Sequence, residues 1–500
     1  METFQILCNV AVIILALYYY FTSILNFWKV RGVRGPRPIP GFGNSKDILL
    51  RRIKLGDYMI KLNSEYKDEP LIGLFDMREP ILIVKDPDLI KDVLIKDFTT
   101  FANRGYSIHE KVEPLTQNLF FLEAKRWRTL RTKLSPVFTS RKLQGMFLMI
   151  SVCADHLVDY MGQLVNKNEP VECVEVMANY TLDCIGICAF GIEMKALSDK
   201  ENEYRRIAKQ IFKPPVKGLL RLRLKQFSPR LYAILGHILP DTKLNSFFIN
   251  LVLNNIAYRE KNNIVRNDFI DILRELKKHS DKMDFDFTDT LMVSQAFTFY
   301  AAGFETSSTA ISNTLYELAL NQEIQDKLRK EIDEEYAKHG SSLLYDNIKK
   351  MNYLEKVFKE SLRKYPPLIN FTRVAQSNYT FKDTEISIPK GQTIWIPIFA
   401  LQHDPHIYPE PDVFDPERFN EEAVRSRHPM FYLPFGDGPR NCIGARFAIY
   451  QSKIGLIKML RNYKFESCEK TKIPYERNDN TFIVKPKNGI YLKITKINRT

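Results

Sequence analysis

The sequence predicts a mainly α-helical protein with small β-sheets, preceded by one membrane-spanning helix. Three observations support this class: an uncharged apolar run at the N-terminus, long amphipathic stretches further on, and short β-rich runs between them. The chain has 500 residues, of which 45% are hydrophobic, so it can bury a large core. No Gly/Ser-rich tract and no repeat divides the sequence, and we expect a single globular body.

Residues 1–28 have the composition of a membrane anchor. No charge occurs from Thr3 to Trp28, and about 20 apolar residues span about 30 Å of hydrocarbon. A cleaved signal peptide is the alternative, but it would begin with positive charges, whereas this chain begins Met1-Glu2. The basic residues follow the run, which predicts a cytosolic body, and the tyrosines and Trp28 suit the membrane interface.

Residues 29–45 are basic and contain several prolines. Proline fixes φ and removes an N–H donor, so this segment is expected to be extended and stiff. A flexible linker is the alternative, which the prolines disfavour. We therefore predict a spacer between the anchor and a globular body of residues 46–500.

The body is predicted to be helical over most of its length, with strands at two places. Pro80–Val84 is typical of a short buried strand, and Asp86 opens a helix that ends near Lys96. Strands return within 371–396, and two more are expected near 481–496. Apolar residues recur at helical spacing in four long stretches, 141–165, 174–190, 244–278 and 288–338.

The charge and the cysteines narrow the functional classes. A formal net charge of +14 suits nucleic acid, an anionic membrane or an acidic partner, but no basic tract is interleaved with aromatics, which disfavours nucleic acid. The basic, leucine-rich segment 213–240 fits a membrane surface and a solvated helix pair equally well. The seven cysteines include no CxxC pair, and their spacing does not resemble that of a zinc-binding site. Their odd number and spacing favour a reducing compartment.

Residues 434–444, with the sequence PFGDGPRNCIG, carry the most specific signal in the chain. Their glycines and prolines indicate a tight turn before Cys442, and a helix is expected from Gly444 to about Leu460. Backbone N–H groups and the dipole at a helix N-terminus stabilise a thiolate. A lone cysteine beside glycines is more often structural, so the surrounding pattern has to decide its role.

The spacing Phe435-x-x-Gly438-x-Arg440-x-Cys442-x-Gly444 resembles the haem-binding signature of the cytochrome P-450 (haem-thiolate monooxygenase) family. The resemblance extends from near residue 30 to the C-terminus and is most like the insect microsomal, xenobiotic-metabolising branch. It implies the cytochrome P-450 fold with a single haem domain. It also implies haem b with Cys442 as the axial thiolate and O2 as co-substrate.

Two further motifs support the resemblance. Glu360-Ser361-Leu362-Arg363 resembles the ExxR pair of the family, and i,i+3 spacing places its charged ends on one helix face. Pro416-Glu417-Arg418-Phe419 resembles the PERF segment. The resemblance implies that Glu360, Arg363 and Arg418 form a buried triad that locks the haem loop, in which every member is needed.

The segment Ala301-Ala302-Gly303-Phe304-Glu305-Thr306 lies within the expected helix 288–338. The resemblance implies that Ala302 and Gly303 leave room for dioxygen. An acid next to an alcohol relays protons, so Glu305 and Thr306 are the expected catalytic pair for O–O cleavage. A solvated glutamate and a threonine bonded to its own helix are the alternative.

The resemblance also implies contacts for the haem propionates and the substrate. Trp127 and Arg131, one helical turn apart, match a family motif over one haem edge. Arginine binds carboxylates in charge-assisted pairs, and three more arginines match such positions: Arg104, Arg373 and Arg440. Four residues match positions of an apolar pocket that suits a lipophilic substrate: Phe297, Ala301, Leu368 and Ile369.

The expected activity is the oxidation of lipophilic xenobiotics, such as plant toxins and insecticides, at the cytosolic face of the endoplasmic reticulum. A dedicated hydroxylase of a hormone, sterol or fatty acid is the alternative. The chain has no GxGxxG fingerprint. Electrons are therefore expected from NADPH through NADPH–cytochrome P-450 reductase, with cytochrome b5 as a second candidate donor. The membrane lipid is the remaining expected partner.

Other functional classes fit the residues less well. Family members that rearrange or dehydrate peroxides without a reductase tend to lack the acid–alcohol pair that Glu305 and Thr306 provide. A non-enzymatic haem sensor usually adds a signalling domain, for which this chain leaves no room. A mitochondrial location is disfavoured because the N-terminus is not an Arg-rich, acid-poor presequence.

Overall fold

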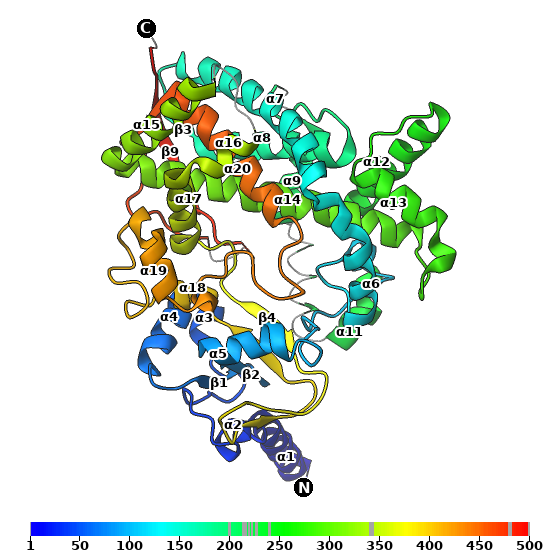
Figure 1. The fold of residues 1–500 in the computed structure, drawn as a ribbon. Coiled ribbons are helices and arrows are strands. Elements are labelled where there is room, and N and C mark those ends of the chain that lie inside the picture. Colours follow the sequence, from blue (N-terminus) through cyan, green and yellow to red (C-terminus); the bar gives the residue numbers. More distant parts are fainter. Residues whose placement is uncertain are drawn as a thin grey trace. The chain divides into compact units, whose positions relative to one another are not determined.

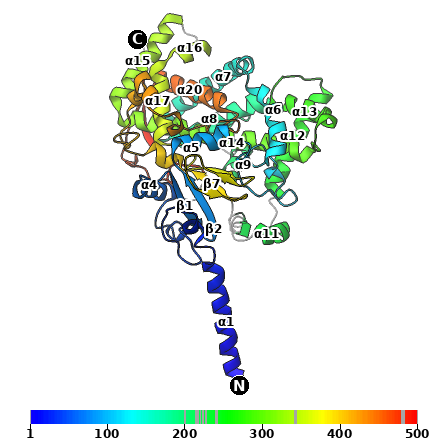
Figure 2. The same ribbon diagram turned by 60° about the horizontal axis from the view of Figure 1, so that its bottom comes forward.

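The computed structural model describes residues 2–198, 202–212, 218, 221, 224, 225, 229–238, 242–339, 345–478 and 483–498. The chain divides into two compact units. Unit 1 comprises residues 1–105, 368–413 and 421–441, and unit 2 comprises 106–367, 414–420 and 442–500. Figures 1 and 2 show that strands gather in unit 1, whereas long helices make up most of unit 2.

Unit 1 is built around a four-stranded sheet of order β1-β2-β7-β4. Strands β1 and β2 form an antiparallel hairpin, β2 runs parallel to β7, and β7 runs antiparallel to β4. Both faces of this sheet are covered, which explains why β1 and β2 are largely apolar and do not alternate with polar residues. The strands are β1 (Leu71–Asp76), β2 (Glu79–Val84), β4 (Phe371–Val374) and β7 (Thr393–Ile396).

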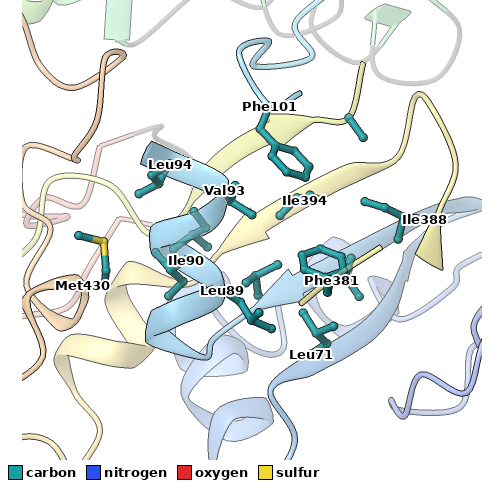
Figure 3. Close-up of a cluster of buried hydrophobic side chains, with 14 of the residues drawn as sticks. Leu71, Leu89, Ile90, Val93, Leu94, Phe101, Phe381, Ile388, Ile394 and Met430 are labelled. Atoms are coloured by element: carbon teal, nitrogen blue, oxygen red, sulfur yellow. The ribbon is translucent and has the colours of Figure 1, made fainter. Parts of the chain in front are cut away.

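Alternate side chains of the sheet enter two separate apolar clusters. Leu71, Leu82 and Ile394 belong to one, and Ile72 and Ile83 belong to the other. Figure 3 shows the first cluster, in which Leu89, Ile90, Val93 and Leu94 of a helical segment lie over the sheet. Other elements of unit 1 are α1 (Glu2–Thr22), α2 (Phe27–Val30), α3 (Lys46–Leu49), α4 (Leu55–Glu65), α5 (Pro87–Lys91), η1 (Asp92–Lys96), β5 (Tyr379–Thr380), β6 (Ser387–Ile388), α18 (Ile398–Gln402), α19 (Glu421–Ser426) and η8 (Pro429–Phe431).

The segment predicted as a spacer packs on strand β1. The amide of Gly73 donates to the carbonyl of Arg34 at 2.8 Å, and Asn44 exchanges hydrogen bonds with Phe75. Trp28 is buried, and its indole N–H donates to the Leu74 carbonyl at 2.8 Å. Trp28 is therefore a core residue of unit 1, and its predicted place at the membrane interface is wrong.

Unit 2 surrounds the helix α14 (Asp289–Leu320), which is buried on all sides over its second half. Helices α8 and α20 pack against it (Figure 1). A small sheet of order β3-β9-β8 completes the unit. The other elements of unit 2 are η2 (Pro114–Thr116), α6 (Ala124–Leu134), η3 (Ser135–Phe138), α7 (Ser140–Val165), β3 (Val171–Glu172), α8 (Cys173–Ile185), η4 (Gly186–Phe190), α9 (Glu203–Phe212), α11 (Pro229–Leu235), η5 (Gly236–Ile238), α12 (Thr242–Lys261), α13 (Phe269–Lys278), η6 (Ser280–Lys282), α15 (Gln322–His339), α16 (Tyr345–Lys350), α17 (Asn352–Lys364), η7 (Pro416–Phe419), α20 (Ala445–Asn462), β8 (Tyr463–Glu466) and β9 (Tyr491–Lys496).

The predicted fold class is confirmed, with local differences. Two long helical stretches are each divided: 244–278 forms α12 and α13, and 288–338 is divided at Asn321 between α14 and α15. Strands β1, β3 and β8 were not predicted. Of the two strands expected near 481–496 the structure describes β9, while residues 479–482 lie outside the described residues. Most of the basic, leucine-rich segment 213–240 also lies outside them.

Two segments among the described residues are long and apolar enough to cross a membrane. Cys173–Phe190 is mostly buried within unit 2, as expected for a core helix. None of Thr3–Thr22 is buried, and its side chains are exposed as far as Tyr20 (Figure 2), which leaves an apolar surface that water would solvate poorly. Thr3–Thr22 is therefore the candidate membrane span.

Candidate functional site

Cys442 lies in unit 2, two residues before Gly444, the N-cap of α20. Its side chain is exposed, whereas four of the other cysteines, at positions 153, 173, 184 and 188, are buried. Arg131 of α6 is close enough to interact with it electrostatically. Burial lowers the pKa of the Arg131 guanidinium, and the charge on Cys442 opposes that change. A helix N-terminus and a cation thus both favour a thiolate here.

The turn that precedes the cysteine belongs to unit 1 and needs its glycines. Gly436 and Gly438 have φ values of +70° and +72°, which L-residues rarely adopt. A Cβ on Gly438 would lie 2.0 Å from the carbonyl oxygen of Leu94 in η1. The turn therefore packs directly on the backbone of η1, and this contact limits how far it can move.

Three of the arginines predicted to bind carboxylates also belong to unit 1. Arg440 is buried and donates to the Ala102 carbonyl, and Arg104 donates to the Arg440 carbonyl at 3.1 Å. Arg373 is buried on strand β4. The structure brings Arg104 and Arg440 together, and the amide of Val374 donates to Asn103, which ties β4 to the same region.

The remaining two propionate candidates belong to unit 2. Trp127 and Arg131 are both on α6, where Trp127 is buried and Arg131 is half-buried. Phe435, at the start of the motif, is half-buried in unit 1.

Glu360, Arg363 and Arg418 meet in the interior of unit 2. Arg363 donates two hydrogen bonds of 2.8 Å to the Glu360 carboxylate, and both side chains are fully buried. Arg418 of η7 lies 3.5 Å from the same carboxylate, and the amide of Asp415 donates to it at 3.1 Å. Burial raises the pKa of the Glu360 carboxyl, and the hydrogen bonds from Arg363 and Asp415 oppose that rise. The Glu360 carboxylate on α17 therefore holds η7 through its contacts with Arg418 and the Asp415 amide.

The residues predicted for oxygen chemistry lie in the middle of α14. The Thr306 hydroxyl donates to the Ala302 carbonyl at 2.7 Å, which is the back-bonded conformation. Glu305 is buried and accepts a hydrogen bond from the ammonium group of Lys485, a residue that no sequence motif singles out. The alternative of a solvated Glu305 is thus wrong.

Gly303 has a packing role that the sequence did not reveal. A Cβ at this position would lie 2.3 Å from Cδ1 of Ile185, a fully buried residue of α8. The missing side chain lets α14 approach α8 closely. Ala302, its neighbour, is exposed. This packing is a reason for the glycine that does not depend on oxygen chemistry, and the predicted room for dioxygen stays a prediction.

The four predicted pocket residues are divided between the units. Phe297 and Ala301 are half-buried on α14, and the Phe297 ring contacts Phe248 edge-on at 5.0 Å. Leu368 and Ile369 belong to unit 1, where Ile369 packs on the second apolar cluster and is partly a core residue. A separate polar groove of about 810 Å³ between α9 and α12 contains none of the four.

Comparison with known proteins identifies the family. Residues 33–494 match the model of the family described as Cytochrome P450. The chain belongs to the cytochrome P450 family. It is 38% identical to "Cytochrome P450 6B2" of Helicoverpa armigera over 494 residues, 97% of each chain. It is 39% identical to "Probable cytochrome P450 6a14" of Drosophila melanogaster, over 98% of this chain and 99% of that one, and 36% identical to "Cytochrome P450 6j1" of Blattella germanica, over 97% and 96%.

The chain is thus a cytochrome P450 monooxygenase, and the family implies haem with a cysteine thiolate, and O2. The residues present fit that group. In unit 2, an exposed thiol at a helix N-terminus is accompanied by a half-buried arginine. In unit 1, the buried guanidinium groups of Arg373 and Arg440 suit the carboxylates that a haem carries.

Replacement of Arg363 tests the buried pair. Arg363→Leu leaves the Glu360 carboxylate buried without its main partner, and we expect a loss of about 3–5 kcal/mol in the free energy of unfolding. Arg425→Leu is the control, because its ion pair with Glu421 is exposed and contributes little. Chemical denaturation measures both variants. Equal, small losses in the two variants would contradict the argument.

Replacement of Gly303 separates packing from room for oxygen. We expect Gly303→Ala to lower the melting temperature, although alanine is a better helix former by about 1 kcal/mol. Ile185→Val removes the Cδ1 atom that the new methyl group meets and alone costs about 1 kcal/mol. Thermal unfolding of the double variant should show less loss than the sum of the two. Strict additivity would show that Gly303 does not serve this contact.

Proposed function

We propose that this protein oxidises lipophilic xenobiotics, and that Cys442 is the axial ligand of its haem. The observation that carries the proposal is the Cys442 thiol, which lies at the start of α20 within electrostatic reach of Arg131. The relatives named above are insect members of the same family, which supports a role in the chemistry of foreign compounds. A dedicated hydroxylase of an endogenous lipid is the alternative that experiment has to exclude.

The bound haem would supply the activation of O2 and the insertion of one oxygen atom into the substrate. The chain's own residues prepare the site for that chemistry. Arg104, Arg131, Arg373 and Arg440, together with Trp127, are proposed to bind the propionates. Thr306 holds a proton on Oγ1 and Glu305 exchanges protons with it, while the apolar side chains of Phe297 and Ala301 exclude water.

Electrons are proposed to come from NADPH through a membrane-bound reductase, with cytochrome b5 as a second donor. An acidic docking face on the reductase would complement a basic surface here. On α6, Lys125, Arg128 and Lys133 are exposed, and Lys125 lies 4.0 Å from the exposed carboxylate of Asp284. Arg126, in contrast, is half-buried and pairs with Glu123 and Glu110. The first three are therefore the better candidates for the contact.

The proposed location is the cytosolic face of the endoplasmic reticulum membrane. Residues 1–28 contain the exposed apolar helix α1, and the basic residues that follow suit the cytosolic side. Residues 46–500 are proposed to be the catalytic domain. Residues 29–45 would then connect α1 to this domain while packing against β1.

The spectrum of the reduced, carbon monoxide-bound protein tests the ligand. We expect wild type to show the Soret band of thiolate-ligated haem and Cys442→Ala to lose it, because only a thiolate gives that band. Cys468→Ala is the matched control, since Cys468 is a partly buried thiol whose sulfur accepts a hydrogen bond from Thr471. A Cys442→Ala protein that keeps the band would contradict the assignment.

Turnover with a panel of compounds tests the substrate class. Purified protein with reductase and NADPH should oxidise several structurally unrelated plant toxins or insecticides, because an apolar pocket places few directional demands on its ligand. Omission of the reductase should abolish product formation. Activity restricted to one hormone, sterol or fatty acid would exclude broad specificity and support the dedicated hydroxylase.

A further inference from the structure

A buried ion pair joins α14 to the C-terminal part of unit 2. The ammonium group of Lys485 donates to the carboxylate of Glu305, and each side chain is only 9% exposed. Two charges are removed from water here, and such a pair persists only where the geometry is well satisfied. Glu305 is also the acid of the proposed proton-relay pair, so its partner bears on function.

Several contacts fix the place of Lys485. The amide of Val484, its buried neighbour, donates to the Pro367 carbonyl at 3.0 Å, and the amide of Asn478 donates to the Lys485 carbonyl at 2.8 Å. The ammonium lies 5.5 Å from the centroid of the Phe212 ring on α9. These contacts come from three separate parts of unit 2, so the ammonium has little freedom to move.

Phe212 also supports the helix that carries the acid. Its ring meets Phe304 edge-on at 5.6 Å, and Phe304 is fully buried next to Glu305 in the sequence. The cation, the carboxylate and the two aromatic rings therefore form one packed group, which we call the Lys485 cluster: Phe212, Phe304, Glu305 and Lys485.

The cluster determines where the carboxylate of Glu305 lies. The hydroxyl of Thr306 donates to its own helix at Ala302, and Glu305 makes no hydrogen bond to Thr306 within the described residues. The carboxylate is held by Lys485 instead. Any exchange of protons between Glu305 and Thr306 therefore starts from a position that Lys485 sets.

We propose that Lys485 is a positioning residue for Glu305 and thereby controls how efficiently reducing equivalents reach the product. The inference rests on the proposed function of Glu305 and Thr306. In coupled turnover, substrate, O2, NADPH and a proton give the hydroxylated product, water and NADP⁺. In uncoupled turnover, O2, NADPH and a proton give hydrogen peroxide and NADP⁺, and the substrate is unchanged. A displaced carboxylate favours the second outcome.

The main test compares Lys485→Met with Lys487→Met in the full-length protein with reductase. Lys487, two residues after Lys485, is the matched control, because its ion pair with Glu476 is exposed. We expect Lys485→Met to reduce product formed per NADPH by about tenfold, the lower end of the range for residues that orient a site's first layer of side chains. Hydrogen peroxide should rise correspondingly. Lys487→Met should match wild type.

Two further variants keep the test decisive. Lys485→Arg retains the cation and should recover most of the coupling. If Lys485→Met holds no haem by its carbon monoxide spectrum, Lys485→Gln takes its place with the same expected direction. Wild-type coupling in the neutral variant that holds haem would overturn the proposal.

Thermal unfolding provides a readout that does not depend on turnover. Lys485→Met and Glu305→Gln should each lower the melting temperature, and the double variant should lose less than their sum, because it leaves no unpaired buried charge. A purely structural pair would show this non-additivity while product per NADPH stayed at the wild-type value in Lys485→Met. That combination, or additive losses, would also overturn the proposal.

Glu305→Gln separates this inference from the proposed function. Full coupling in Glu305→Gln would show that the acid has no part in the chemistry, and the proposed relay would fail. Reduced coupling in Glu305→Gln with full coupling in Lys485→Met would leave the relay standing and refute the role of Lys485. Reduced coupling in both supports the two together.

Discussion

A carboxylate that is buried away from water has to keep its hydrogen-bonding and charged partners. In unit 2 this requirement applies to Glu360, whose partners come from two separate elements, α17 and η7. Arg363 on the same helix satisfies both carboxylate oxygens, and the amide of Asp415 and the guanidinium of Arg418 approach from η7. Because none of these groups can leave without exposing a charge to an apolar interior, η7 cannot detach from α17. Glu417, in the same turn, adds ion pairs to Lys327 and Lys356 on the surface.

The same principle operates on α14, with a different consequence. Glu305 is buried in the middle of this helix, so its carboxylate has to be neutralised by a neighbour. Lys485 does this from a distant part of the chain, and it thereby holds the acid of the proposed proton-relay pair. Two buried ion pairs thus serve one unit: the first holds a chain segment, and the second holds the side chain on which the proposed proton transfer depends.

The sequence predicted the features that depend on local pattern. Helical periodicity located α7 and α8, and the turn residues around Cys442 indicated where α20 begins. The fixed spacing around Cys442 indicated the family. The spacing of Glu360 and Arg363 was also sufficient to place them on one helix face. These features need no information about what lies far away in the sequence.

Features that depend on distant contacts were not predictable in this way. Lys485 lies 180 residues from Glu305 in the sequence, and nothing in its own neighbourhood indicates a buried partner. The contact of Gly303 with Ile185 also joins distant parts of the chain, so the local sequence did not reveal this packing reason for the glycine. Trp28 was predicted at the membrane interface because its ring is apolar and carries a polar N–H group. In the structure the indole N–H donates to a carbonyl of β1, and the ring is buried in the core of unit 1.

If Cys442 supplies sulfur to a haem iron, as proposed, the surroundings of the iron reveal it. X-ray absorption at the iron edge of the purified, haem-loaded protein measures the elements that surround the metal. We expect one sulfur neighbour in wild type and none in Cys442→Ser, where oxygen replaces the sulfur. A wild-type spectrum that fits nitrogen and oxygen alone, or a sulfur that persists in Cys442→Ser, would contradict the account.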